Sequence, residues 1–328
     1  MKENVWQDTI RVREVIVIGG GLAGLSAAVY LGRGRRDTLL IHSDRSMAKW
    51  EAEVQNYLGF PEGIAGTDLL HRGRVQVARF HVDMVEDEVG SVAKAGETFL
   101  VEGTHTTYRA KRLLIATGLT HIPPDIPGVR ECLGKSLFFC KDCDAYRLQG
   151  KRVIIIGRTN EAADYALAML LFSPSVMIST NGKDFVWDRA HADWLEEYRI
   201  PIRRDSIRGV DHDDGQLRAL TFERGGPMQV DAVFTTRGDL PHSGLAEGAG
   251  AATDEEGHLI VDEHLRTTVP GLYAAGCVTP ANCQMIIAAG QGAIAAQAIN
   301  RDLFEESLDR HALPRCGEPP HARVNTII

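Results

Sequence analysis

The feature that most constrains this chain is a glycine-rich turn between a short apolar run and a helical stretch. Residues 14–18 have the β-branched composition of a buried strand in a parallel sheet. They lead directly into Gly19-x-Gly21-x-x-Gly24, a spacing typical of a turn that cradles a pyrophosphate, because a Cβ would block the turn and the phosphate's approach. A helix over about 25–31 and a strand over 38–41 complete a βαβ unit, the context that this motif requires. The alternative is a glycine turn that holds no nucleotide.

An acidic residue follows the second strand at the distance typical of a dinucleotide-binding unit. Asp44 stands 20 residues beyond Gly24, near the position where a carboxylate binds a ribose hydroxyl. His42 and Ser43 lie closer to the end of the strand and are alternatives to it. The cofactor site predicted from this unit comprises Gly19, Gly21, Gly24 and Asp44.

The remaining elements predict an α/β fold with two domains, as 328 residues suggest. Residues 101–108 are predicted as a strand with polar alternation, and residues 112–118 as a buried strand ending in glycine. Three prolines within 123–127 predict a crossing between domains. A second βαβ unit begins near residue 152, and a final helix is expected over about 284–301.

Composition restricts the class of partner. Lys and Arg number 36 against 44 Asp and Glu, and the resulting charge of −8 argues against a nucleic-acid binder or a protein of anionic membranes. The polar N-terminus has no apolar signal-peptide core and no apolar stretch approaches about 20 residues. We therefore expect a cytoplasmic protein, in which a close cysteine pair is more often catalytic or metal-binding than a structural link.

Such a pair is Cys140-Lys141-Asp142-Cys143. Two intervening residues let both sulfurs meet if this segment begins a helix, whose N-terminus favours the thiolate. An accessible thiolate is what disulfide exchange requires. Asp144 follows at once, and a carboxyl group beside a dithiol can move the proton that exchange requires.

Other interpretations of these residues stay open. Asp144 can simply stabilise a helix N-terminus. The cysteine pair can be buried and inert, or it can bind zinc, although a structural zinc site usually takes a second Cys-x-x-Cys or a histidine pair. Five residues lie between Cys277 and Cys283, and no such histidine pair follows, so no metal site is predicted.

In combination these residues resemble the low-molecular-weight thioredoxin reductase family of flavoproteins, from about residue 13 to 302. The order and spacing of the matching segments are specific, although each segment alone is not. The likeness rests on Gly19 to Gly24, on Glu-Val-Gln-Asn-Tyr-Leu-Gly-Phe-Pro at 53–61, on Ala-Thr-Gly at 116–118, on 140–144, on Pro-Gly-Leu-Tyr-Ala-Ala-Gly at 270–276, and on Gln284.

The resemblance implies two Rossmann-like, three-layer ββα nucleotide-binding domains. The FAD domain, 1–122 and 245–328, would be split by an inserted domain, 123–244, that carries the dithiol. A homodimer and a large rotation between the domains are implied, with Cys143 facing the flavin and Asp144 acting as the acid. The residues placed around FAD are Asn56, Thr117, Gly118, Gly276, Gln284 and the residue after Gly276, here Cys277.

Several positions depart from the family pattern. The second glycine turn is Gly157-x-Thr159-x-x-Ala162, with Asn160 inside it, and Thr159 has a side chain where a pyrophosphate would come close. Residues 179–183, Ser-Thr-Asn-Gly-Lys, replace the basic cluster that holds the 2′-phosphate of NADPH. Cys277 replaces an aspartate, either as a small packing residue or as an extra redox thiol, and Cys283 replaces an arginine. Cys316 is either a free cysteine of the tail or a further relay.

These departures lead to one main hypothesis of function. The chain is expected to be an FAD-dependent disulfide oxidoreductase that does not use NAD(P)H. Electrons would come from a ferredoxin-type protein or from a second FAD in the degenerate nucleotide site, and would pass to a thioredoxin-like protein or a small disulfide. The alternatives are an NADPH-dependent thioredoxin reductase, a dithiol oxidase that uses oxygen, and a redox-sensing or flavin-binding protein without turnover.

Overall fold

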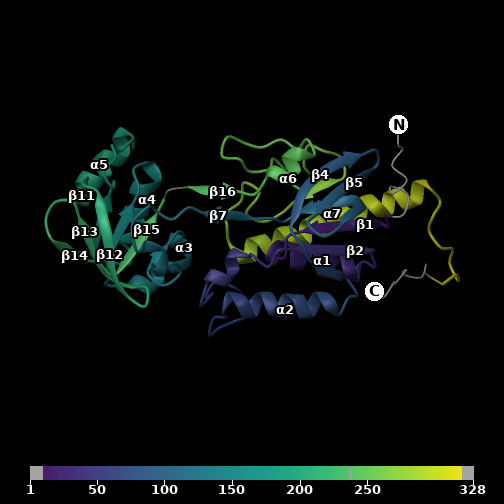
Figure 1. Ribbon diagram of the computed structural model, residues 1–328, viewed down its shortest axis with the longest axis horizontal. Coiled ribbons are helices and arrows are strands. Elements are labelled where there is room, and N and C mark those ends of the chain that lie inside the picture. The colour runs from purple at the N-terminus through teal and green to yellow at the C-terminus, as the bar shows by residue number, and fades with distance from the viewer. Residues whose placement is uncertain (1–9, 237, 320–328) are drawn as a thin grey trace. The chain divides into compact units, whose positions relative to one another are not determined.

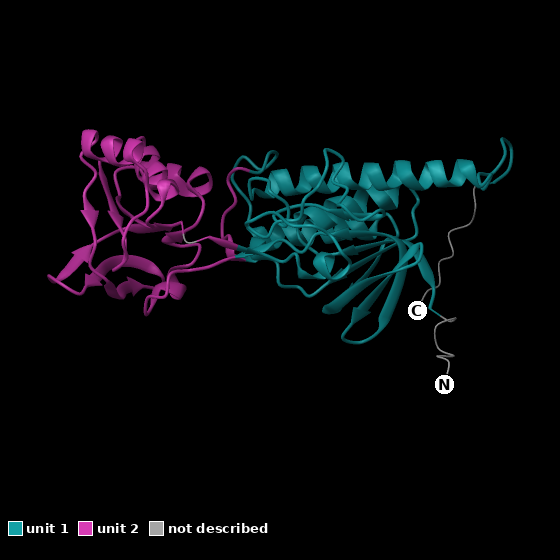
Figure 2. Cartoon of the chain, turned by 90° about the horizontal axis from the view of Figure 1, so that it is seen from above, with its two compact units in different colours: residues 1–49, 57–120, 240–328 teal, residues 50–56, 121–239 magenta. Residues whose placement is uncertain are grey.

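The computed structural model describes residues 10–236 and 238–319, so both ends of the predicted FAD domain and residue 237 lie outside the described residues (Figure 1). Contacts between residues within the chain are concentrated in two compact units (Figure 2). Unit 1 comprises residues 1–49, 57–120 and 240–328, and unit 2 comprises residues 50–56 and 121–239. Unit 1 is therefore discontinuous in sequence.

Unit 1 is built on a seven-stranded sheet with the order β3-β2-β1-β6-β5-β4. The long strand β6 pairs with β5 along its first half and with β17 along its last residues. Pairing is parallel among β1, β2, β3, β6 and β17, and antiparallel among β4, β5 and β6. The strands are β1 Val12–Ile18, β2 Thr38–His42, β3 Asp83–Glu86, β4 Val89–Ala95, β5 Thr98–Gly103, β6 Thr107–Ile115 and β17 Leu272–Ala274.

Two apolar cores cover the two faces of this sheet. One core packs side chains of β1 and β2 against helices α1 and α7, which lie side by side in Figure 1. The other core packs side chains on the opposite face of β1, β2 and β6 against side chains of strands β4 and β5 and of helix α6. The helices are α1 Leu22–Arg33, α2 Gly66–Ala78, α6 Gly244–Gly248 and α7 Met285–Asp309.

Unit 2 contains a parallel five-stranded sheet, β11-β10-β9-β15-β8, and an antiparallel three-stranded sheet, β12-β13-β14. Buried side chains on β9, β10 and β15 form its cores. Its strands are β8 Leu137–Phe138, β9 Arg152–Ile156, β10 Ser175–Ser179, β11 Ile202–Arg203, β12 Ile207–Asp213, β13 Gln216–Phe222, β14 Pro227–Gln229 and β15 Ala232–Thr235. Its helices are α3 Lys141–Asp144, α4 Asn160–Met169 and α5 Arg189–Glu197.

The remaining elements are short. The two chain segments that cross between the units pair as a two-stranded sheet, β7 Leu119–His121 with β16 Asp239–Pro241. Three 3₁₀ helices are η1 Met47–Trp50, η2 Val129–Cys132 and η3 Ala145–Leu148. The predicted α/β class with two Rossmann-like units is confirmed.

Two predicted elements are wrong in their extent. The single strand expected over 101–108 is two strands, because Asp87 accepts hydrogen bonds from the backbone N–H groups of Thr104 and His105 and stabilises a turn there. The last helix runs eight residues beyond the expected 301, to Asp309. Ion pairs from β6 and the segment before β17 hold its second half, Arg112 to Glu306 at 3.0 Å and Arg266 to Asp302 at 2.6 Å.

No helix in the described part of the chain is long and apolar enough to cross a membrane.

Candidate functional site

The first candidate site lies where three parallel strands of unit 1 end together. Strand register aligns Ile18 of β1 with Ile115 of β6, and Ile115 with Ala274 of β17. The chain leaves these strands through Gly19, through residues 116–118 and through Gly276. The predicted cofactor residues therefore converge at one sheet edge, the position where α/β sheets bind nucleotides.

The glycine turn is tightly packed at two of its three glycines. Gly19 has φ +120°, and a Cβ built there would lie 2.1 Å from the carbonyl oxygen of Ala116. A Cβ on Gly24 would lie 1.9 Å from the carbonyl oxygen of Gly19. Gly21 differs, because the nearest atom to its Cβ would be Ser46 Oγ at 3.7 Å, which leaves space outside the turn. Glycine is thus required for the fold at Gly19 and Gly24, and it leaves room for a ligand at Gly21.

This difference gives a matched pair of variants. Gly24→Ala is expected to lower the melting temperature by roughly 2–10 °C, because two backbone segments must move apart. Gly21→Ala is expected to leave the melting temperature of flavin-free protein unchanged and to lower the FAD content, since its methyl group would occupy the space left for phosphate. Thermal unfolding and flavin absorbance measure the two effects. Full FAD content in Gly21→Ala would contradict this assignment of the turn.

The strand-end residue His42 provides a polar atom that lacks a partner. A Cβ on Gly20 would lie 2.7 Å from that of His42, so the ring is beside the turn. His42 Nδ1 is buried without a hydrogen-bond partner among the described residues, and burial lowers the pKa of this histidine. Asp44 is engaged otherwise, because hydrogen bonds from Lys49 and Arg74 lower its pKa to about 2. The contact of Asp44 with a ribose stays a prediction. His42 is the stronger candidate for a contact with the nucleotide, because its Nδ1 has no partner among the described residues.

The other two strand ends are held by hydrogen bonds within unit 1. Thr117 Oγ1 donates to the carbonyl oxygen of His242 at 2.7 Å, and the N–H of His242 donates to the carbonyl oxygen of Gly118 at 2.9 Å. The N–H of Gly276 donates to Gln291 Oε1 at 2.7 Å. Sequence reasoning missed His242 and Gln291, because neither belongs to a motif.

These features fit an FAD. The turn leaves space at Gly21, helix α1 directs its N-terminus at that space without an acidic residue in its first turn, all of which the structure describes, and His42 offers a buried polar atom. The cofactor residues of unit 1 would hold its phosphates and ribose. Asn56 belongs to the 50–56 segment of unit 2, and Gln284 is the residue before α7, so their predicted flavin contacts stay predictions.

The second candidate site, in unit 2, is the predicted cysteine pair. Cys140 and Cys143 form a disulfide, and both residues are partly exposed. Cys140 is the residue before helix α3, so the pair meets the condition that it begins a helix. Exposure of the disulfide permits attack by an external thiol.

Asp144, beside this disulfide, is only 6% exposed. Burial, together with the neighbouring carboxylate of Glu51, raises its pKa to about 7. Arg147 Nη1 lies 3.2 Å from Asp144 Oδ1 and acts in the opposite direction. Burial also raises the pKa of Glu51. A carboxyl group that titrates near neutral pH can donate and accept protons, which a surface carboxylate at a helix start would not do.

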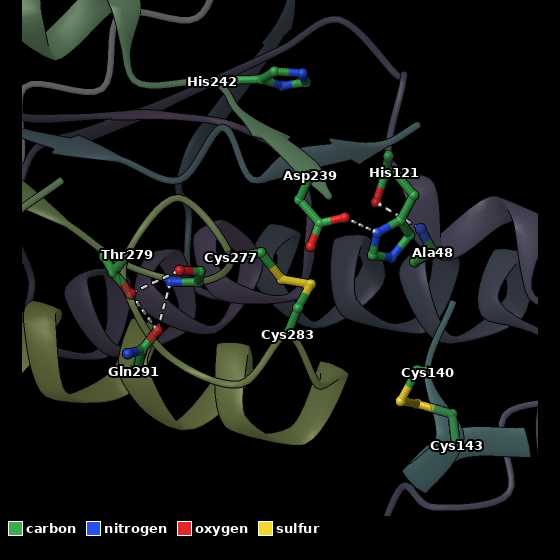
Figure 3. Close-up of a disulfide and its surroundings, with 12 residues drawn as sticks. Ala48, His121, Cys140, Cys143, Asp239, His242, Cys277, Thr279, Cys283 and Gln291 are labelled. Carbon is green, nitrogen blue, oxygen red and sulfur yellow. Dashed lines mark hydrogen bonds and ion pairs between the residues drawn. A yellow bond between two sulfur atoms is a disulfide. The ribbon is translucent and has the colours of Figure 1, made fainter. Parts of the chain in front are cut away.

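A further disulfide corrects the interpretation of Cys277. Cys277 and Cys283 are bonded to each other, so Cys277 is not merely a small packing residue (Figure 3). Cys132 is buried and Cys316 exposed, both as free thiols. Within residues 10–236 and 238–319, no group of His, Cys, Asp or Glu is arranged to hold a metal ion.

The second glycine turn, at Gly157, Thr159, Asn160 and Ala162, is partly exposed and hydrogen-bonds to another segment of its own unit. The segment 184–188 lies against it: the N–H of Val186 donates to the carbonyl oxygen of Arg158 at 2.7 Å. Asn160 and Asp188 exchange two hydrogen bonds, of 2.9 and 2.8 Å. Hydrogen bonds from His191 lower the pKa of Asp188, which precedes helix α5, so an ionised carboxylate lies beside Asn160, the first residue of helix α4. This charge opposes a pyrophosphate at that position.

Comparisons with known proteins agree with this arrangement. Residues 13–296 match the family described as pyridine nucleotide-disulphide oxidoreductase. A thioredoxin reductase of Listeria innocua is 28% identical over 316 residues, covering 92% of this chain and 98% of its own. One of Treponema pallidum is 30% identical over 302 residues, with 87% and 95% covered. The solved structure of a putative thioredoxin reductase from Bacillus anthracis superposes with a TM-score of 0.83 at 30% identity, covering 89% and 99%.

Proposed function

This chain belongs to the pyridine nucleotide-disulphide oxidoreductase family, and we propose that it reduces a thioredoxin-like disulfide with electrons that do not come from NADPH. It is a thioredoxin-reductase-like flavoprotein disulfide oxidoreductase.

The observation that carries the proposal is the contrast between the two glycine turns. The turn at Gly21 is open and has a helix N-terminus without acidic residues in its first turn, all of it described. Residues 184–188 hydrogen-bond to the turn at Thr159 and bring the ionised Asp188 beside it, and Glu161 lies in the first turn of helix α4. The carboxylate of Asp188 would repel the phosphates of a nicotinamide dinucleotide or of a second FAD at the second turn. This favours a donor that does not bind there, such as a one-electron protein of the ferredoxin type.

Cys140 and Cys143 would carry out exchange with the acceptor. The Cys140 thiolate attacks the external disulfide and forms a mixed disulfide, and Cys143 then attacks Cys140 and releases the reduced acceptor. Asp144, with its pKa near neutrality, would give the proton that the departing thiolate requires. FAD, when bound, supplies the electron pair that returns Cys140–Cys143 to the dithiol state. As the resemblance implies, we propose that the protein acts as a homodimer.

Anaerobic mixing of the purified flavoprotein with each candidate donor tests the proposal. Reduced ferredoxin is expected to bleach the flavin absorbance rapidly, whereas NADPH and NADH are expected to leave it unchanged on the same timescale. The Cys140→Ser/Cys143→Ser variant is the matched control, because its flavin should still be bleached while a thioredoxin-like disulfide stays oxidised. Rapid bleaching by NADPH would overturn the proposed donor and leave the oxidoreductase assignment standing.

A further inference from the structure

We propose that Cys277–Cys283 is a second redox-active disulfide, which exchanges an electron pair with an external dithiol. The proposed function uses Cys140–Cys143 alone, so this inference adds a site to it. Four observations carry it: the position of the disulfide, the way its loop is anchored, the exposure of its cysteines and its place before a long helix.

The disulfide lies at the candidate cofactor edge of unit 1. Cys277 directly follows Gly276, at the end of the strand β17 that pairs with β6. Gly276 in turn lies against helix α1, because a Cβ built on it would be 3.0 Å from that of Ala23. The disulfide is therefore near the strand ends where the glycine turn begins, and not in a remote part of the fold.

The loop between the two cysteines is held without the sulfur–sulfur bond. Val278 and Thr279 are fully buried. Thr279 Oγ1 and N–H both donate to the carbonyl oxygen of Gly276, at 2.8 and 2.9 Å, and the carbonyl oxygen of Val278 accepts from Leu259 at 2.8 Å. Thr279 also reaches Gln291 of helix α7 (Figure 3). Reduction can therefore open the disulfide while the loop keeps its anchors, which a reversible redox centre requires.

The exposure of the two cysteines is the third observation. Each is partly exposed, and the neighbouring Asn282 is exposed. The first turn of helix α7 adds two exposed apolar residues, Ile286 and Ile287, at 40% and 37% exposure. A disulfide that served only to hold the fold together would gain from burial, whereas one that exchanges with a partner must present a sulfur.

The position of Cys283 favours it as the leaving thiolate. It lies two residues before Met285, the first residue of the 25-residue helix α7. This helix, described over its whole length, has no acidic residue in its first turn, so its positive end is available to stabilise an anion. A better leaving thiolate departs faster, which directs attack to the Cys277 sulfur.

The reaction balances as a two-electron exchange. A thiolate of the external dithiol attacks Cys277 Sγ, the bond to Cys283 Sγ breaks, and Cys283 leaves as a thiolate. The second external thiol then attacks the mixed disulfide and releases Cys277. The external dithiol ends as a disulfide, and its two electrons and two protons reside on Cys277 and Cys283.

A thiol-trapping titration tests this on folded protein. The flavin-containing Cys140→Ser/Cys143→Ser variant is equilibrated with graded ratios of reduced to oxidised dithiothreitol and then trapped with N-ethylmaleimide. We expect Cys277 and Cys283 to become labelled together and reversibly while circular dichroism stays native. The half-reducing ratio should lie within about a hundredfold of that for Cys140–Cys143 in the matched Cys277→Ser/Cys283→Ser variant. Labelling that appears only with denaturant would overturn the proposal.

The same titration separates this proposal from the proposed function. If Cys140–Cys143 titrates and Cys277–Cys283 stays oxidised in the folded protein, only the second site fails. If Cys140–Cys143 resists reduction, the proposed function fails independently.

Single-cysteine variants test the direction of attack. The Cys283 thiol in Cys277→Ser should be alkylated at a lower pH than the Cys277 thiol in Cys283→Ser. Near pH 6.5 its alkylation rate should be about fivefold higher. Equal profiles, or the reverse order, would overturn the assignment of Cys283 as the leaving group.

Discussion

Cys143→Ser is expected to lower disulfide reduction by roughly three orders of magnitude or more, because Cys140 alone cannot release the reduced acceptor. The first thiolate attack needs only Cys140, so this variant should accumulate a mixed disulfide with a thioredoxin-like substrate. Turnover assays measure the first effect, and non-reducing electrophoresis measures the second. The flavin content should be unchanged, since the predicted cofactor turn belongs to unit 1 and Cys143 to unit 2.

The matched control is Cys316→Ser, which removes an exposed free thiol from the same chain. It should keep full activity and form no mixed disulfide. Retention of activity by Cys143→Ser would contradict the role of Cys140 and Cys143 in disulfide reduction. It would then favour the alternative hypothesis of a flavin-binding protein in which this pair does not turn over.

Asp144→Asn is expected to slow disulfide exchange by roughly 10²- to 10⁴-fold, the range typical for loss of a general acid. The acid form of Asp144 donates the proton, and its pKa is about 7. The exchange rate of the native protein should therefore fall as the pH rises through 7, and the variant should lose this limb of the profile. A variant with the native profile would contradict the role of Asp144 as the acid.

The same carboxyl group predicts a pH dependence of stability. The folded pKa, about 7, lies above the ordinary value of 3.8, so between about pH 4 and pH 7 the folded state keeps a proton that the unfolded state has lost. The free energy of unfolding contributed by Asp144 is full below pH 4 and is lost as the pH rises through 7, by up to about 4 kcal/mol. Denaturant unfolding across this window should show a smaller decline in Asp144→Asn. Glu51→Gln is the matched comparison, because burial raises the pKa of Glu51 too and its stabilising effect is lost in the same direction.

Local sequence was sufficient for the elements in which sterics or bonding act between near neighbours. The glycine turn could be predicted because Gly19 and Gly24 approach one another within a single βα unit. The Cys140–Cys143 disulfide could be predicted because the pair spans one helical turn. Likewise, the α/β class followed from alternating apolar strands and helices. In contrast, the extent of two elements depended on distant partners, Asp87 for the turn at 104–106 and Arg112 with Arg266 for the second half of α7.

The sequence by itself therefore determined the two chemical centres, the cofactor turn and the dithiol, since each is formed by contacts within a few residues. Only the tertiary structure decided how their surroundings tune them. It buried Asp144 and brought Glu51 near it, which together raised the pKa of that acid, and it placed residues 184–188 in contact with the second glycine turn. It also joined Cys277 to Cys283, in a loop that Leu259 and Gln291 anchor through hydrogen bonds to Val278 and Thr279. The burial of a side chain, the charges around it and the course of a loop depend on residues far apart in the chain. They therefore cannot be predicted from the spacing of motifs in the sequence.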